Sequence, residues 1–317
     1  MRGDPPRVDA RSALAALRDD LASRGIRLTK KRGQNFMIDP AIAGAVARAS
    51  GAQDGGLVFE VGPGAGHLTR EVVKLGARVV AVEIDRGLAA YLRDVMSAEI
   101  ADGRLIIVEA DVLGGEDRLA PEATRALNEG LARAGADSFV VAANLPYNIA
   151  ATFLIALAGS GLPWTGGAVV LQKEVADRLA AEPGSKTYGA STVMWRLLAL
   201  GRVERNVGRE VFWPRPDVDS ALMVIEPRED APRDLMTDAD SFTDFGDFVR
   251  ALFSQRRKVL RTSVAHAARA WAGGFADEAR ALAEHALAAA GVDPGTRVER
   301  VEPERILALW RAAREGR

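Results

Sequence analysis

The stretch Val58–Val73 reads VFEVGPGAGHLTREVV and changes character twice along its length. It begins as an apolar run, passes through glycines at positions 62, 64 and 66, and continues with apolar residues at helical spacing. Glycine lets a backbone turn sharply and approach a ligand, so the stretch predicts a strand, a ligand-binding turn and a helix. A dinucleotide turn, G-x-G-x-x-G, would need its third glycine at position 67, where this chain has His67.

Strands and helices alternate on both sides of this stretch. The expected strands are Leu57–Val61, Arg78–Glu83, Arg104–Glu109, Phe139–Ala143 and Ala168–Gln172, with helices such as Arg86–Ala98 and Ala150–Leu157 between them. Apolar strands that alternate with helices predict a parallel sheet covered on both faces. Two later strands, Val203–Val207 and Ala221–Ile225, have no helix between them and should pair antiparallel at one edge. The predicted fold class is α/β, a Rossmann-like, mostly parallel seven-stranded sheet followed by a small all-helical domain.

The domain boundaries follow from changes in composition. Residues 1–23 are expected to form an N-terminal extension, disordered over residues 1–10 and helical over 11–24. Residues 24–228 form the predicted ligand-binding domain, in which residues 114–137 are interpreted as a surface insertion, with a helix within it as one option. Residues 229–317 form the predicted helical domain, with helices at Phe242–Ala270, Asp277–Ala290 and Glu302–Glu315.

The composition excludes several classes of protein. The 317 residues contain no cysteine and three histidines, so neither a disulfide framework nor a zinc site is indicated. No apolar run is long enough to span a bilayer and no secretory signal is visible, so a cytoplasmic protein is expected. The net charge is −1, which argues against general attraction to nucleic acid. Two runs without acids do leave room for RNA contacts, one within Arg24–Arg32 and one within Arg250–Arg269.

Acids follow the glycine turn at the next two strand tips. Glu83 ends the second strand of the core and could accept hydrogen bonds from both hydroxyls of a ribose. Asp111 follows the third strand and could accept one from an adenine amino group. Either acid alone could be merely solvated, but glycine, Glu83 and Asp111 on successive tips suit an adenosine group bound across the sheet.

The fourth strand tip carries Asn144-Leu145-Pro146-Tyr147. Asn and Pro often end strands and Tyr often covers the edge of a core, so a structural role is one interpretation. The tetrad, the turn EVGPGAGHLT, EID and Asp111 together resemble adenine-N6 methyltransferases that use S-adenosylmethionine. The segments KKRGQNFMID, LQKEVADRL, SKTYGASTV, VFWPRPDVDSALMVI and LFSQRRKVLR narrow the resemblance to the ribosomal RNA adenine dimethyltransferase family.

This resemblance extends from about Arg24 to Leu309 and is strongest to the bacterial members that act on the small ribosomal subunit. It implies N6,N6-dimethylation of two adjacent adenines in a hairpin near the 3′ end of the small-subunit rRNA. It implies S-adenosyl-L-methionine as cofactor, no metal, the pre-30S particle as partner and a monomeric enzyme.

The resemblance also implies roles for particular residues. The cofactor would be held by Asn35, Met37 (through its backbone), Gly62, Gly64, Glu83, Asp111 and Asn144. The reacting adenine would meet Asn144, Leu145, Pro146 and Tyr147, with Phe212 as the other wall for the base. Arg256, Arg257 and Lys258 would contact rRNA phosphates, although a solvated helix face is an alternative for these three.

Three other functions remain open from the sequence. A large-subunit rRNA methyltransferase that confers macrolide resistance would share the core motifs, although SKTYGASTV and the helical tail favour the small-subunit enzyme. A catalytically silent rRNA-binding assembly factor is disfavoured by the intact Glu83, Asp111 and Asn144. An NAD-dependent oxidoreductase is disfavoured by the glycine spacing and by the tetrad.

Overall fold

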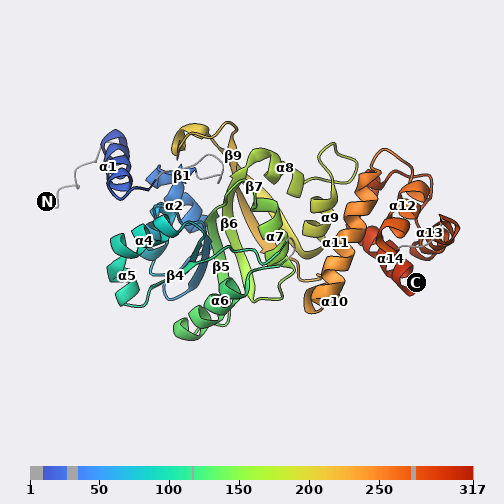
Figure 1. Cartoon of the computed structure of the whole chain (residues 1–317), viewed down its shortest axis with the longest axis horizontal. Coiled ribbons are helices and arrows are strands. Elements are labelled where there is room, and N and C mark those ends of the chain that lie inside the picture. The colour runs from blue at the N-terminus through green and yellow to red at the C-terminus, as the bar shows by residue number, and fades with distance from the viewer. Residues whose placement is uncertain (1–9, 27–34, 116–117, 273–275, 317) are drawn as a thin grey trace.

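The computed structural model describes residues 10–26, 35–115, 118–272 and 276–316. Figure 1 shows an elongated molecule with the sheet at its centre, helix α1 at one end and helices α12–α14 at the other. The strands are β1 (Phe36–Met37), β2 (Leu57–Val61), β3 (Arg78–Glu83), β4 (Leu105–Glu109), β5 (Phe139–Asn144), β6 (Trp164–Gln172), β7 (Ala199–Val207), β8 (Phe212–Trp213) and β9 (Ser220–Pro227). The helices are α1 (Ala10–Ser23), α2 (Pro40–Ala49), α3 (His67–Lys74), α4 (Arg86–Val95), α5 (Ser97–Ala101), α6 (Pro121–Ala134), α7 (Ala150–Ala158), α8 (Lys173–Leu179), α9 (Ala190–Leu198), α10 (Arg233–Thr237), α11 (Ala239–Ser254), α12 (Leu260–Ala272), α13 (Ala276–Ala290) and α14 (Pro303–Glu315). Within these ranges, no helix is both long and apolar enough to cross a membrane.

The main sheet has seven strands in the order β4-β3-β2-β5-β6-β9-β7. Neighbouring strands from β4 to β6 pair in parallel, and β9 pairs antiparallel with both β6 and β7. The predicted α/β class and the antiparallel late strands are therefore confirmed. A second, two-stranded sheet of β1 and β8 was not expected, because each of its strands has only two residues.

Side chains of the central strand alternate between two hydrophobic cores. Phe59 of β2 is fully buried among residues of α6 and α7, whereas its neighbour Val58 is fully buried among residues of α2 and α3. Burial of a side chain the size of Phe59 stabilises the fold by about 1.5–3 kcal/mol. The two cores hold the strands rigidly, and this rigidity fixes the positions of their carboxyl ends.

Residues 114–137 do contain a helix, as the sequence allowed, but they are not a surface insertion. They contain α6, which packs on β2, β3 and β4 and buries Ala123, Ala126, Leu127 and Gly130. A Cβ at Gly130 would lie 2.5 Å from Cγ2 of Val80, so the helix approaches the sheet very closely. The segment is the crossover helix between two parallel strands, and its small residues at helical spacing form the buried face.

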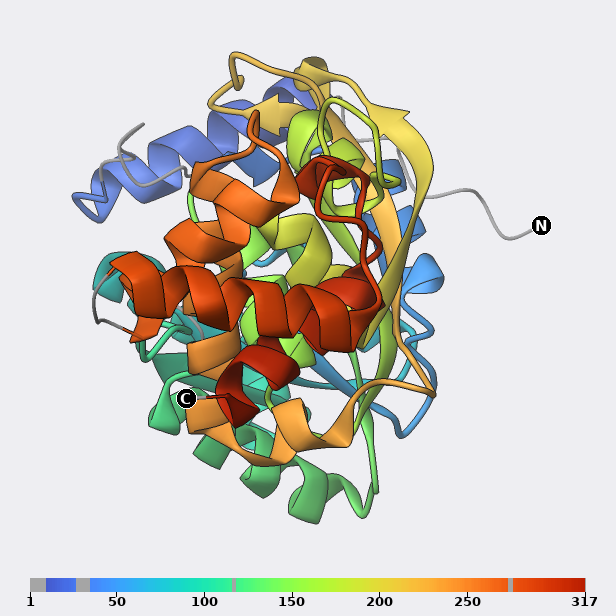
Figure 2. The same cartoon turned by 90° about the vertical axis from the view of Figure 1, so that its right-hand side faces the viewer.

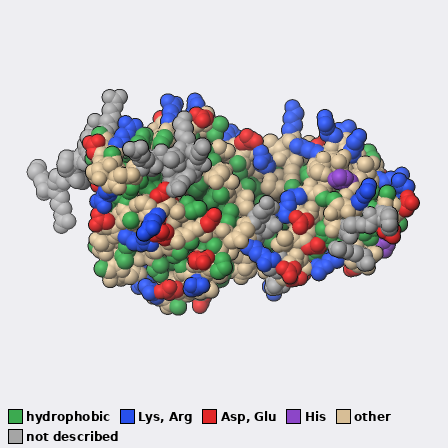
Figure 3. Space-filling view, viewed as in Figure 1, with side chains coloured by type: hydrophobic (Ala, Val, Ile, Leu, Met, Phe, Trp, Pro, Cys, Tyr) green, Lys and Arg blue, Asp and Glu red, His purple; other side chains and the backbone are tan. Residues whose placement is uncertain are grey.

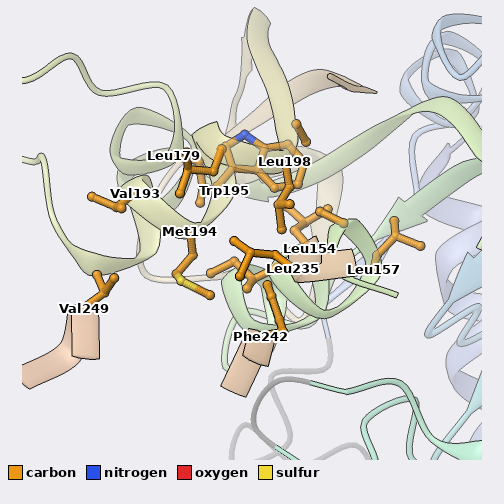
Figure 4. Packing of buried hydrophobic residues seen from close by; sticks show 14 of the residues in the cluster. Leu154, Leu157, Leu179, Val193, Met194, Trp195, Leu198, Leu235, Phe242 and Val249 are labelled. Carbon is orange, nitrogen blue, oxygen red and sulfur yellow. The ribbon is translucent and has the colours of Figure 1, made fainter. Parts of the chain in front are cut away.

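The C-terminal helices share a core with the sheet. Figure 4 shows Phe242 of α11 beside Leu235 of α10 and Met194 of α9, with Leu154 of α7 in the same cluster. Figure 2 shows the last helices stacked across this end of the molecule. The single helix expected at Phe242–Ala270 is two helices, α11 and α12, separated at residues 255–259. An isolated bridge from Val259 to Arg297 accompanies the break.

The N-terminal helix predicted at residues 11–24 is confirmed as α1. Leu21 is buried in a small cluster with Phe36, Leu88 and Tyr91. Arg24 forms ion pairs with Asp20 (2.9 Å) and Asp94 (2.8 Å). Arg24 therefore helps to hold α1 in place, while Arg27, Lys30, Lys31 and Arg32 lie outside the described residues, as does most of the expected disordered segment 1–10.

Candidate active site

A cavity opens where β2, β3, β4 and β5 end. Its walls include Asn35, Phe36, Gly62, Gly64, Ile84, Glu83, Asp111, Val112, Asn144 and Pro146. Residues far apart in the chain thus meet where an open parallel sheet binds its ligands. The structure brings together most of the residues predicted from the sequence for cofactor binding.

The glycine turn needs its glycines for two reasons. Gly62 and Gly64 have φ angles of +66° and +55°, in the left-handed region that side chains rarely adopt. A Cβ on Gly64 would also lie 2.7 Å from Cε1 of Phe36. Phe36 therefore covers the turn from the N-terminal side, and the bare backbone forms one wall of the cavity.

Glu83 ties the tip of β3 to the glycine turn. Its Oε2 accepts a hydrogen bond from the Gly64 N–H (3.1 Å) and its Oε1 accepts one from the Asp85 N–H (2.9 Å). The side chain is 4% exposed. Burial raises the pKa of this carboxyl, and the backbone N–H groups of Asp85 and Gly64 oppose the rise. The remaining lone pairs of both oxygens are available to a ligand in the cavity.

Asp111 presents a more open carboxylate. Its Oδ1 accepts the Leu113 N–H at 2.9 Å, and the residue is exposed. Ile84 and Val112 follow directly after Glu83 and Asp111, and both line the cavity. Sequence reasoning gave no role to these apolar residues, although their position next to strand-tip acids was a usable signal. An acid beside an apolar surface suits a flat heterocycle with a polar edge.

Asn144 is oriented by a residue 109 positions earlier. Its Nδ2 donates a hydrogen bond to the Asn35 carbonyl oxygen at 2.7 Å. This bond fixes which end of the amide is which, so Oδ1 can accept a hydrogen bond from a ligand. The Leu145 N–H donates to the Val170 carbonyl at 2.9 Å. No backbone N–H of the described residues donates to the Leu145 carbonyl, whereas the Pro146 carbonyl accepts from Ile149 at 3.1 Å.

Leu145 and Tyr147 do not line this cavity. The Leu145 side chain is buried in the core, so only its backbone can serve the site. The Tyr147 hydroxyl lies 2.8 Å from Oγ of Ser220, at the start of β9. This hydrogen bond holds the half-buried ring next to Pro146.

Two other predicted residues lie in the core. Met37 is 3% exposed and Phe212, opposite it across the β1–β8 pair, is also 3% exposed. The Phe212 ring packs in the same hydrophobic core as residues of α2 and α3, and its role as a wall for a base stays a prediction. Its neighbour Trp213 is half-buried and lies 6.2 Å from the Phe36 ring, centroid to centroid.

Arg256, a predicted phosphate contact, already has partners within the chain. Its guanidinium donates to Oε2 of Glu299 (2.9 Å) and to the carbonyl oxygens of Lys186 (2.7 Å) and Ser185 (3.3 Å). These bonds connect the end of α11 to two loops, so the side chain is a structural link. Arg257 and Lys258 are exposed. Among the described residues, no cluster of three or more potential metal ligands is present.

Known structures and sequences agree with this geometry. A dimethyladenosine transferase from Plasmodium falciparum has a TM-score of 0.67 at 19% identity, over 88% of this chain and 97% of that chain. The 23S rRNA methyltransferase ErmE has a TM-score of 0.56 at 25% identity, over 88% of this chain and 100% of that chain. The fold is that of the Rossmann-like methyltransferases.

Sequence comparison is more specific. The family model described as ribosomal RNA adenine dimethylase matches residues 25–307. Proteins named ribosomal RNA small subunit methyltransferase A are similar along nearly their whole length. The one from Streptomyces avermitilis is 36% identical, over 94% of this chain and 92% of that protein. The one from Leifsonia xyli is 39% identical, over 90% and 93%. The chain belongs to the ribosomal RNA adenine dimethylase family.

Proposed function

We propose that this protein uses S-adenosylmethionine to dimethylate N6 of two adjacent adenines in a hairpin near the 3′ end of small-subunit rRNA. It acts as a monomer on the pre-30S particle, in the cytoplasm where ribosomes assemble. The observation that carries the proposal is the meeting of Glu83, Asp111 and the oriented Asn144 amide around one cavity.

The cavity residues fit an adenosyl cofactor from one end to the other. Asp111 accepts from the adenine amino group, with Ile84 and Val112 against the ring. Glu83 accepts from the ribose hydroxyls. The glycine turn, Asn35 and the backbone of Met37 hold the amino-acid end, where no Cβ at positions 62 and 64 obstructs it. When bound, this cofactor supplies an electrophilic methyl group.

The tetrad activates the target adenine by hydrogen bonding. The lone pair of an adenine amino group is delocalised into the ring, so the nitrogen is a poor nucleophile. The two N–H groups of the adenine donate hydrogen bonds to Oδ1 of Asn144 and to the Leu145 carbonyl oxygen. These bonds turn the nitrogen lone pair out of conjugation with the ring and stabilise the positive charge that forms on the nitrogen. The proton then passes to water, so positioning supplies much of the rate enhancement.

Tyr147 provides a ring face for the base once it leaves its RNA stack. Replacing Tyr147 by alanine is expected to lower kcat/KM for rRNA by about 10-fold or more, since base–aromatic stacking contributes roughly 1–3 kcal/mol. Tyr147→Phe keeps the ring and loses only the hydrogen bond to Ser220, so most activity should remain. Steady-state kinetics with small subunits measures both variants. Equal activity of the alanine and phenylalanine variants would show that the ring does not stack on the base.

A second, basic cavity begins one helical turn beyond the active site. Asn148 and Ile149 line the first cavity, while Ala151 and Thr152 at the start of α7 line the second. Its other walls carry Arg178, Lys186, Arg250 and Arg256, with Glu174 paired to Arg178 at 2.6 Å. Figure 3 shows Lys and Arg side chains gathered along the upper edge of the helical end. This side of the molecule receives the rRNA backbone next to the target adenine.

Arg257 and Lys258 are the residues to replace in a test of rRNA binding, because both are exposed. Replacing Arg256 would also break its hydrogen bonds within the protein. The double variant Arg257→Glu/Lys258→Glu should weaken small-subunit binding. It should also flatten the slope of log affinity against log salt by about 0.7–0.9 for each phosphate that the protein no longer neutralises. Cofactor affinity should not change.

The matched control is Arg125→Glu/Arg133→Glu, which makes the same charge change on the exposed face of α6. Filter binding across a salt series compares the two double variants. If both behave alike, the weaker binding reflects net charge, and Arg257 and Lys258 touch no phosphate.

One transfer assay separates the proposed function from its competitors. Labelled S-adenosylmethionine is incubated with the protein and either undermethylated small subunits or free large-subunit RNA. Label in small subunits alone is expected. Label in large-subunit RNA alone would indicate the macrolide-resistance activity, and label in neither would indicate an assembly factor without activity.

A further inference from the structure

Helix α1 packs behind the cofactor cavity without lining it. Leu21 is 1% exposed and belongs to a small hydrophobic cluster with Phe36, Leu88 and Tyr91. Phe36 of β1 and Leu88 of α4 both line the cavity, whereas no described residue of α1 does. One side chain of α1 therefore packs with residues from two separate walls of the site.

The end of α1 is turned onto the start of α4. The Gly25 N–H donates to the Ala22 carbonyl (2.9 Å) and the Ile26 N–H donates to the Leu21 carbonyl (2.9 Å). This hydrogen-bond pattern ends a helix and brings the residue after the glycine back against the last turn. Ile26 joins the cluster of Leu21, and its Cγ1 would lie 3.4 Å from a Cβ on Gly87.

Two arginines attach α1 to the same two walls. Arg24 pairs with Asp94 of α4 at 2.8 Å. The guanidinium carbon of Arg18 lies 4.9 Å from the ring centroid of Trp213 in β8, and that ring in turn contacts Phe36. Exposed ion pairs are weak on their own, so the buried Leu21 supplies most of the attachment and the arginines set its orientation.

These contacts reach the proposed reacting groups through Phe36. The Phe36 ring lies against the glycine turn, where a Cβ on Gly64 would be 2.7 Å from its Cε1. The preceding residue, Asn35, accepts the hydrogen bond that orients the Asn144 amide (2.7 Å). A displacement of Phe36 would therefore disturb both the turn at the cofactor and the amide at the adenine.

The α4 wall is linked to Glu83 in a similar way. Oδ1 of Asp85 accepts hydrogen bonds from the Gly87 N–H (2.9 Å) and the Leu88 N–H (3.2 Å) in the first turn of α4. The Asp85 N–H donates to Oε1 of Glu83 at 2.9 Å. The helix that α1 packs against is thus connected to the acid proposed to meet the ribose.

We infer that α1 is a clamp that holds the Phe36 and Leu88 walls in the arrangement that binds the cofactor, with Leu21 and Arg24 as positioning residues. This inference rests on the proposed use of S-adenosylmethionine. Docking of α1 and binding of the cofactor stabilise each other, because both depend on the same walls. Linkage makes the effect reciprocal, so each event tightens the other by the same factor.

Loosening α1 should raise the KM for the cofactor with little change in kcat. Leu21→Ala removes the buried contact, and its affinity for S-adenosylmethionine should fall by about tenfold, within the range of typical couplings between sites. Saturating cofactor docks the helix again, so single-turnover methyl transfer should approach the wild-type rate. Calorimetry gives the dissociation constant of each variant.

A double-mutant cycle tests Arg24. Arg24→Gln and Asp94→Asn should each weaken cofactor binding by about twofold, as expected for an exposed pair. The double variant should bind no more weakly than either single variant, because both changes remove one interaction. Arg24→Lys keeps the cation and should bind the cofactor nearly as the wild type does.

Hydrogen exchange measures the coupling in the unaltered protein. The backbone amides of α1 should exchange about tenfold more slowly with saturating S-adenosylhomocysteine than without it. The amides of α13 should exchange at the same rate in both states, because α13 lies at the opposite end of the molecule (Figure 1). A helix that only stabilises the fold would show no such difference from α13.

The matched control for Leu21→Ala is Leu287→Ala. Leu287 of α13 is 2% exposed, so the same buried side chain is truncated far from the cavity. This variant should have a lower melting temperature and an unchanged affinity for S-adenosylmethionine. If both variants lose cofactor affinity equally, the loss reflects general destabilisation and α1 has no positioning role.

The outcomes separate this inference from the function beneath it. Unchanged cofactor affinity in a folded Leu21→Ala variant would overturn the clamp, and so would equal exchange of α1 with and without S-adenosylhomocysteine, even if Leu21→Ala fails to fold. Loss of rRNA binding by Arg24→Gln at unchanged cofactor affinity would make α1 an RNA contact instead. If the wild type binds no adenosyl compound, the proposed function itself fails.

Discussion

Replacing Asn144 by alanine should reduce methyl transfer at saturating cofactor about 10²–10³-fold or more while the fold survives. The reason is the loss of a pre-oriented acceptor for the charge that develops on the adenine nitrogen. Single-turnover transfer to small subunits is the appropriate measurement, because it separates chemistry from cofactor binding. The hydrogen bond from Nδ2 to the Asn35 carbonyl fixes the orientation of the Asn144 amide, with Oδ1 as the acceptor for the adenine.

Asn144→Asp is the informative companion variant. It keeps the size and an acceptor oxygen but loses the N–H that bonds Asn35, so its activity should also fall. A melting temperature close to that of the wild type is the control for both changes. If Asn144→Ala transfers methyl groups at a near-normal rate, the tetrad is only the structural end of a strand.

Replacing Glu83 by alanine should weaken S-adenosylmethionine binding by roughly ten- to a hundredfold. Removing a charged acceptor from two ribose hydroxyls costs on the order of 1.5–3 kcal/mol. The alanine variant also loses the bonds from Gly64 and Asp85 that fix the glycine turn. Glu83→Gln keeps one oxygen acceptor and should therefore bind more tightly than Glu83→Ala.

The matched control for Glu83 is Glu109→Ala. Glu109 lies opposite Glu83 at the tip of β4 but is exposed, pairs with Arg93 at 3.4 Å and does not line the cavity. Exposed ion pairs contribute little to stability, so its removal should be nearly silent. An unchanged dissociation constant for Glu83→Ala in calorimetry would take Glu83 out of the cofactor site.

The sheet could be predicted because its signals are local. Each core strand is an apolar run bounded by glycine, acid or asparagine, and parallel strands are buried on both faces. Leu57–Val61 and Arg78–Glu83 accordingly have the predicted bounds. The acids and glycines that line the cavity could also be predicted, because parallel strands place their carboxyl ends on one edge.

The sequence could not predict the features that depend on residues far apart in the chain. Residues 114–137 contain charged side chains and two glycines near their start, yet Ala123 and Leu127 face the sheet and make the segment a core helix. Phe212 is buried because β8 pairs with β1, a contact between segments far apart in the chain. The basic run at 256–258 does not reveal that Arg256 is held by Glu299. The bond between Asn35 and Asn144 is equally invisible in sequence.

Mapping the methylated nucleotides would test the proposed activity without intermediate assumptions. Undermethylated small subunits are incubated with the protein and S-adenosylmethionine, and the rRNA is digested and analysed by mass spectrometry. We expect N6,N6-dimethyladenosine at two adjacent positions near the 3′ end of the small-subunit rRNA. We also expect both modifications to disappear with Asn144→Ala. Dimethyladenosine found only in large-subunit RNA, or at scattered adenines, would contradict the proposed function.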